Sequence, residues 1–175
     1  MVEIINPGSP SDKQSIPLAT RRGRHIPNEQ RMESSPSQLK KAQDYMLRKH
    51  PRMEPRSLSR IFNCMGHVFA CRRTCIEPEY FIKPIAEDDG YRPLRKAEIP
   101  VPGDIAVYFG HRSKQVEHVG VIIQVNRNIM DAEVSTKILS QFGYDGEYFH
   151  DDNDYPEFLS VSVGPLTLTI WTERL

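Results

Sequence analysis

The sequence predicts an α+β domain in which N-terminal helices pack on an antiparallel sheet. Apolar residues recur at helical spacing over residues 38–49, and a second helical segment follows at 64–74. From residue 99 onward the pattern becomes strand-like, with short apolar runs separated by turn residues. Helices that come first and strands that come last favour an antiparallel meander over a parallel sheet.

The first predicted helix begins at Ser37, a plausible N-cap, and ends at His50-Pro51, because a proline disfavours helical conformation in the residue before it. The second helix runs from about Cys64 to Thr74. Asn63 is a good N-cap, which places Cys64 in the first turn. A connector is predicted at 51–60 and a short helix at 79–86.

The strands are predicted at residues 105–109, 117–125, 137–142, 147–150 and 166–171. The turn Val101-Pro102-Gly103-Asp104 leads into the first of them. The strand at 117–125 has an almost wholly apolar centre, which is typical of a strand that is buried on both faces. We therefore expect it at the centre of the sheet.

The chain divides by composition into an arm and a domain. Residues 1–37 are rich in Pro, Ser and Arg and poor in large apolar side chains, so we expect a loosely ordered N-terminal arm. Residues 38–175 are long enough for one domain. No apolar run reaches the roughly 20 residues that span a bilayer, which predicts no membrane association.

The net charge of +0 conceals two oppositely charged halves. Residues 1–75 carry 14 Lys and Arg against 6 Asp and Glu, and residues 76–175 carry 9 against 17. The basic half can meet a polyanion, or the halves can attract each other within one fold, or much of the positive charge can lie in the arm. No aromatic residues interleave with the scattered arginines, so no nucleic-acid partner is predicted.

The amino terminus has no basic segment followed by a long apolar one, so no cleavable signal peptide is predicted. We expect a cytoplasmic protein, or one exported by a route without such a signal. Cys64, Cys71 and Cys75 are three cysteines in a short window, an odd number that speaks against a disulfide framework.

Cys64 is a candidate nucleophile. The unpaired N–H groups of a helical first turn stabilise a thiolate and lower the pKa of a cysteine placed there. His118 begins the apolar centre of the predicted central strand, and a histidine at such a position can shuttle a proton. A thiol and an imidazole that meet in space perform acyl transfer through a covalent intermediate. The alternative for each residue is simple core packing.

A third group would orient the imidazole through its other nitrogen. The strand after His118 supplies Ser140 and Gln141, and His150 lies a little further on. The side-chain carbonyl of Gln141 can accept a hydrogen bond from the ring, and we favour this residue.

A zinc site is the competing prediction for the second helix. His67, Cys71 and Cys75 fall at intervals of four residues and would form one stripe along it. Side chains spread over roughly 12 Å of helix cannot all reach one ion, so neither a metal nor any other cofactor is predicted.

Four short motifs in the same order resemble the papain-like NlpC and CHAP superfamily of cysteine peptidases and amidases. They are Cys64-Met65-Gly66, Pro102-Gly103-Asp104, His118-Val119-Gly120 and, by position, Ser140-Gln141. The resemblance covers roughly residues 38–171 and implies a papain-like fold. It also implies that Cys64 is the nucleophile, His118 the general base and Gln141 the orienting residue.

The resulting expectation is a cysteine hydrolase that cleaves an amide or isopeptide bond through an acyl-enzyme. The resemblance implies peptidoglycan stem peptides as substrate, and a protein target is the alternative. Asn63 stands where the commonest peptidoglycan endopeptidases carry Asp, and His67 where a small or aliphatic residue is usual. A non-catalytic protein-interaction domain on the same scaffold is the competing function.

Overall fold

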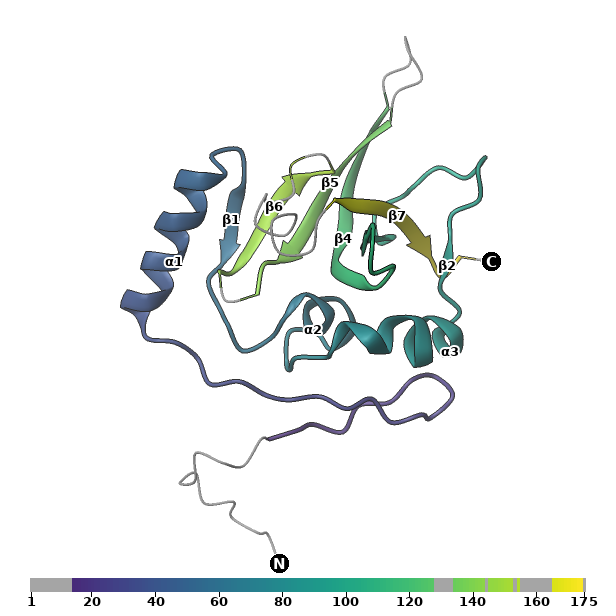
Figure 1. Ribbon diagram of the computed structural model, residues 1–175, viewed down its shortest axis with the longest axis horizontal. Coiled ribbons are helices and arrows are strands. Elements are labelled where there is room, and N and C mark those ends of the chain that lie inside the picture. Colours follow the sequence, from purple (N-terminus) through teal and green to yellow (C-terminus); the bar gives the residue numbers. More distant parts are fainter. Residues whose placement is uncertain (1–13, 128–133, 144, 153, 155–164, 175) are drawn as a thin grey trace, which may run out of the picture.

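A computed structural model describes residues 14–127, 134–143, 145–152, 154 and 165–174. Within these residues, seven strands form one antiparallel sheet in the order β1-β6-β5-β4-β3-β7-β2 (Figure 1). The strands are β1 (Glu54–Ser57), β2 (Arg92–Pro93), β3 (Ile105–Gly110), β4 (Val116–Arg127), β5 (Val134–Gln141), β6 (Glu147–Asp151) and β7 (Leu166–Thr172). The helical segments are α1 (Pro36–Lys49), α2 (Cys64–Phe69), η1 (Pro78–Tyr80), η2 (Phe81–Ala86) and α3 (Glu87–Asp89).

The structure confirms the mixed class and the antiparallel sheet, but the helices do not simply precede the strands. β1 lies between α1 and α2, inside the segment predicted as a connector, and it pairs with β6. β2 likewise follows α3 and pairs with β7. These two strands are only four and two residues long, too short to show an alternating pattern in the sequence.

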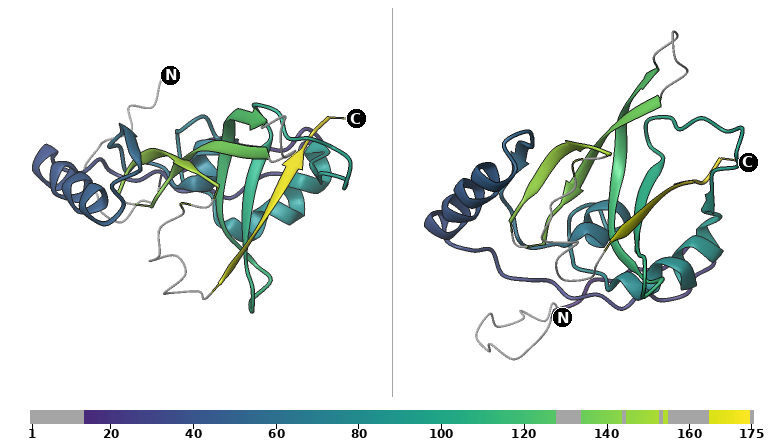
Figure 2. Two further views of the ribbon diagram at one scale, coloured as in Figure 1. Left: turned by 90° about the horizontal axis from the view of Figure 1, so that it is seen from above. Right: turned by 45° about the horizontal axis from the view of Figure 1, so that its top comes forward.

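Helix α1 begins two residues earlier than predicted. Ser35, not Ser37, is the N-cap, and it exchanges hydrogen bonds with Gln38 in a capping box. The helix lies beyond β1 at one end of the sheet (Figures 1 and 2). Its Met46 packs against Phe142 and Tyr148.

Helix α2 ends at Phe69 rather than at Thr74, so it is about half as long as predicted. Cys71 and Arg72 have φ values of 49° and 62°, in the left-handed region that ends a helix. The chain turns back here, and the backbone N–H of Arg72 donates to the carbonyl of Gly66 at 3.0 Å.

Most of the apolar core lies between one face of the sheet and the segments from α2 to η2. Met65, Phe81 and Ile85 pack there against the side chains of β3 and β4. The other face carries a second cluster formed by Ala106, Tyr108, Ile122 and Ile138. Because successive side chains of a strand point to opposite faces, Val119 and Ile122 of β4 belong to different clusters.

Residues 14–35 belong to the expected arm, and we call them the strap; several of them contact the rest of the domain. The strap runs along α2 and α3 (Figures 1 and 2). Ile26 is only 3% exposed and belongs to the main core. Thr20 donates to Asp88 of α3 at 2.6 Å, and Glu29 forms a β-bridge with Cys75. Residues 1–13 lie outside the described part of the chain.

The two oppositely charged halves attract each other within the fold. Ion pairs that join them include Arg21–Glu173, Arg24–Asp88, Arg52–Asp154, Arg56–Glu147 and Arg72–Glu147. Two of the five start from the strap. Much of the positive charge in residues 14–75 is therefore used in intramolecular pairing.

Candidate active site

The N-terminus of α2 is fixed by the side chain of Asn63. Its Oδ1 accepts from the backbone N–H of Gly66 at 2.9 Å and from that of Ile76 at 3.1 Å, and its Nδ2 donates to the carbonyl of Ile76 at 2.7 Å. Gly66 allows the backbone of Thr74 to approach α2 closely, because a Cβ on residue 66 would lie 1.6 Å from the carbonyl oxygen of Thr74. The cap predicted from the sequence is confirmed, and Cys64 is the first helical residue.

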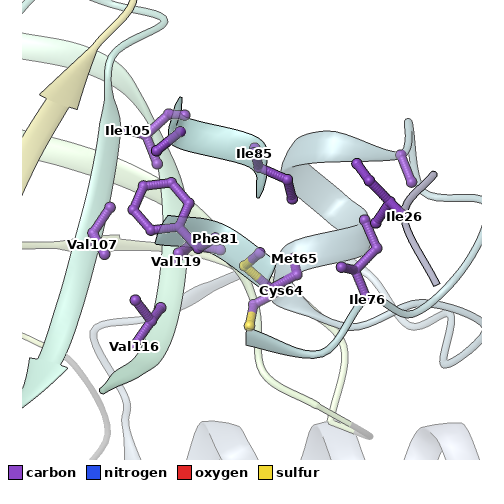
Figure 3. Packing of buried hydrophobic residues seen from close by; sticks show 12 residues of the cluster. Ile26, Cys64, Met65, Ile76, Phe81, Ile85, Ile105, Val107, Val116 and Val119 are labelled. Atoms are coloured by element: carbon purple, nitrogen blue, oxygen red, sulfur yellow. The ribbon is translucent and has the colours of Figure 1, made fainter. Parts of the chain in front are cut away.

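Cys64 lies in the main core, beside Met65 of α2 and Val116 and Val119 of β4 (Figure 3). It is 8% exposed. Burial raises the pKa of the thiol to about 11, although backbone N–H groups of Val119, Met65 and Cys64 itself act in the opposite direction. The sequence predicted a lowered pKa, which is wrong, because desolvation of the thiolate outweighs the N–H groups.

His118 points to the other face of the sheet. Its neighbour Val119 joins the cluster that contains Cys64, so the His118 ring lies opposite, against Tyr108 and Phe142. The ring is parallel to that of Phe142 within 16°, with centroids 4.8 Å apart. Within the described residues, no hydrogen bond joins this ring to the Cys64 thiol, and Nε2 is buried without a partner.

The His118 ring is uncharged over the physiological pH range. Burial is the main cause that lowers its pKa to about 3, and His150 and His67 act in the same direction.

Gln141, predicted to orient His118, lies elsewhere. It is fully buried, and its amide donates to the carbonyls of Ser59 at 3.0 Å and Gly143 at 2.8 Å. The next residue, Phe142, stacks on His118 in its place. The other two candidates bind each other, since Ser140 Oγ and His150 Nε2 are 2.9 Å apart.

A buried carboxylate that was not expected from the sequence lies beside α2. Glu147 begins β6, and its side chain is 0% exposed. Its Oε1 is 2.7 Å from Nδ1 of His67 and also accepts from Nε of Arg72, and its Oε2 accepts from Nη1 of Arg56 at 2.8 Å. The sequence offers one signal for this carboxylate. Glu147 is an acidic residue at the start of a strand, and Tyr148 and Phe149 follow it.

Glu147 is ionised in spite of its burial. Burial alone would raise the pKa of this carboxyl, but the hydrogen bonds from His67 and Arg72 outweigh it and lower the pKa to about 2. Arg56 and Arg72 are about 40% exposed on their side chains, so the cluster extends from the core to the surface. It ties α2 to β6 and β1.

The stripe of His67, Cys71 and Cys75 does not exist, because α2 ends before Cys71. Cys71 is exposed, and the sulfur of buried Cys75 lies 3.8 Å from the carbonyl of Ile61. Across the described ranges, no three His, Cys, Asp or Glu side chains are placed to hold a metal ion. In the same part of the chain, every helix is too short or too polar to cross a membrane.

Comparison of the chain with models of protein families, with curated proteins and with solved structures gave no match.

Proposed function

We propose that this chain is a cysteine hydrolase of papain-like arrangement, in which Cys64 attacks the carbonyl carbon of an amide or isopeptide. The observation that carries the proposal is the position of Cys64 as the first residue of α2, behind the Asn63 cap and packed against β4, where backbone N–H groups of Val119, Met65 and Cys64 act to lower the pKa of the thiol. Such groups favour negative charge on the sulfur and on the oxygen of a tetrahedral intermediate. They come from the start of α2 and from the middle of the neighbouring strand.

The thiol and the His118 imidazole are both neutral at rest. With pKa values of about 11 and about 3, moving a proton from Cys64 to His118 would cost on the order of 10 kcal/mol. This cost is too large for a preformed ion pair of these two residues. The sulfur therefore has to lose its proton as it attacks, to a base that can carry the charge.

Covalent labelling tests the nucleophile. The protein is treated with a peptide vinyl sulfone and with p-nitrophenyl acetate, and adducts are located by intact-mass and peptide mass spectrometry. We expect an adduct on Cys64 that is absent from Cys64→Ala and retained in Cys71→Ser. Cys71→Ser is the matched control, because Cys71 is exposed and lies outside the site. Full hydrolysis of peptidoglycan or isopeptide substrates by Cys64→Ala would refute the assignment.

A non-catalytic protein-interaction domain on the same scaffold is the second candidate. The raised pKa and low exposure of Cys64 favour it, because a structural thiol is buried and inert. Alkylation by iodoacetamide separates the two functions. If Cys71 reacts at every pH up to 9, while Cys64 reacts with neither iodoacetamide nor the acyl probes, the interaction domain is the better assignment.

A further inference from the structure

His67 lies on the same helix as Cys64. Its ring is bound by a carboxylate, whereas the His118 ring has no such partner among the described residues. Cys64 and His67 are three residues apart on α2, a spacing that makes side chains neighbours on one helix face, with Cβ atoms about 5–6 Å apart. Helical side chains also lean toward the N-terminus of their helix. We therefore expect the His67 ring to lie toward the turn that carries Cys64.

The His67 ring is oriented by a carboxylate. Its Nδ1 lies 2.7 Å from Oε1 of Glu147. Because Glu147 is ionised and can only accept, Nδ1 carries the hydrogen, and in the neutral ring Nε2 then has the lone pair. A catalytic triad for acyl transfer has three parts. They are a nucleophile, an imidazole with one nitrogen that can take a proton, and a carboxylate bound to the other nitrogen.

The surroundings of Glu147 keep that orientation fixed. Arg72 and Arg56 each donate to one of its oxygens, so the carboxylate remains ionised inside the protein. It faces His67 from β6, while the arginines approach from the end of α2 and from β1. His118 has no such support, since it packs between Tyr108 and Phe142 with Nε2 unpartnered.

We propose that His67 is the acid–base residue that serves Cys64, and that Glu147 is the positioning residue that holds the His67 ring. This inference rests on the proposed hydrolase function and changes its base from His118 to His67. It also gives the buried Glu147 cluster a role in the chemistry in addition to its role in holding α2 against β6.

The reaction balances with these groups alone. As the sulfur of Cys64 forms its bond to the acyl carbon, its proton moves to Nε2 of His67. The bond to the leaving nitrogen or oxygen breaks, and the leaving group takes that proton. A water molecule then attacks the thioester and gives a proton to His67. The carbon–sulfur bond breaks, and the proton returns to the thiolate.

The test compares acetylation of Cys64 by p-nitrophenyl acetate in four variants. We expect Cys64→Ala to abolish the acetyl adduct and His67→Asn to slow acetylation by about 100-fold or more, the usual contribution of a positioned base. His118→Asn should stay within about threefold of the parent protein. His111→Asn is the matched control, because His111 is exposed on the loop between β3 and β4.

Two further readouts separate chemistry from a purely structural role. Imidazole in solution should restore acetylation to His67→Ala in a concentration-dependent way, which a merely structural histidine would not allow. Glu147→Gln should shift the pH profile of acetylation, because an amide no longer fixes the ring nitrogen that carries the hydrogen. If circular dichroism shows that His67→Asn does not fold, the pH profile of acetylation in Glu147→Gln decides whether His67 takes part in the chemistry.

The outcomes distinguish this inference from the proposed function. Loss of the Cys64 adduct in His118→Asn, with normal acetylation in His67→Asn, would overturn the role of His67 and leave the hydrolase intact. An unchanged pH profile in Glu147→Gln would also overturn it. If the parent protein forms no adduct on Cys64, the hydrolase itself fails.

Discussion

The His118 ring lies flat against Phe142, with centroids 4.8 Å apart and planes 16° apart. His118 therefore packs as an aromatic core residue does, through ring stacking and without a hydrogen bond between the two rings. Stacking therefore explains how His118 is held in place, and burial explains why it remains neutral.

Acid should destabilise the protein through His118. The folded state holds its pKa near 3, far below the ordinary value of 6.5, so the unfolded chain binds a proton first as the pH falls. The free energy of unfolding should then drop by about 1.4 kcal/mol per pH unit below pH 6.5 for this residue. Replacing His118 by Phe keeps the stacking and removes this slope.

Urea unfolding at pH 7, 6 and 5 measures the effect. The His118→Phe variant should lose less stability than the parent protein over this range. Some slope should remain, because burial also lowers the pKa of His150. Equal slopes for the two proteins would contradict the neutral, buried state of His118.

Glu147 should stabilise the fold at neutral pH and lose that contribution in acid. Its folded pKa of about 2 lies below its ordinary value of 4.5, so the contribution is fully present above about pH 4.5 and disappears as the pH falls through 2. The difference corresponds to about 3 kcal/mol. Glu147→Gln should therefore be destabilised by about this amount at pH 7, and by little at pH 2.

Thermal and urea unfolding across pH 2–7 check the size and the sign. Glu54→Gln is the matched control, since Glu54 pairs with Lys137 but is 65% exposed. Exposed pairs contribute about 0–1 kcal/mol, so this variant should resemble the parent protein. A Glu147→Gln variant that is as stable as the parent at pH 7 would show that the cluster is dispensable.

The strap should detach when Asp88 is replaced. Its carboxylate is 1% exposed and accepts from Arg24 and Thr20 of the strap. The hydrogen bond from Arg24 is the main reason why its pKa falls to about 2. In Asp88→Ala the strap loses this anchor, and limited trypsin digestion should cleave after Arg21 or Arg24 at least tenfold faster.

Glu87→Ala serves as the comparison. Glu87 binds the same arginine, but its side chain is 50% exposed, so its removal should change the cleavage rate little. If Asp88→Ala is cleaved as slowly as the parent protein, the other contacts of the strap, such as Ile26 in the core and the Glu29–Cys75 bridge, must be enough to hold it in place.

Replacement of Gly66 by alanine should destabilise the protein by about 3 kcal/mol, because the added Cβ would overlap the carbonyl oxygen of Thr74. Gly23→Asn is a control in open surroundings: Gly23 has φ of 81° and no atom within 4 Å of an added Cβ, and asparagine tolerates the left-handed region. Urea unfolding compares the two. Equal stability of Gly66→Ala and the parent protein would contradict the close contact.

Local signals were enough to predict the cap at Asn63 and the strands that follow residue 104. Both depend on residues that are close in the sequence. The docking of the strap was not predictable in this way, because Ile26 is a single apolar residue among polar ones. It becomes a core residue only through contact with elements that come much later in the chain.

The candidate site was predicted less completely than the fold. Cys64 and its position on α2 followed from the cap. The face of the sheet to which the Gln141 side chain points could not be predicted, because Gln141 and Phe142 are both buried. Only the pairing of β5 with β6 decides which face each residue occupies. The link between His67 and Glu147 spans 80 residues, a separation over which sequence periodicity carries no information.

The same link constrains the order of events during synthesis. His67 and Arg72 leave the ribosome well before Glu147, and their shared partner begins one of the last strands to be made. Until that strand exists, α2 cannot satisfy its buried polar groups in the native way. Contacts between such distant residues close slowly, so we expect the final seating of this helix to follow the synthesis of β6.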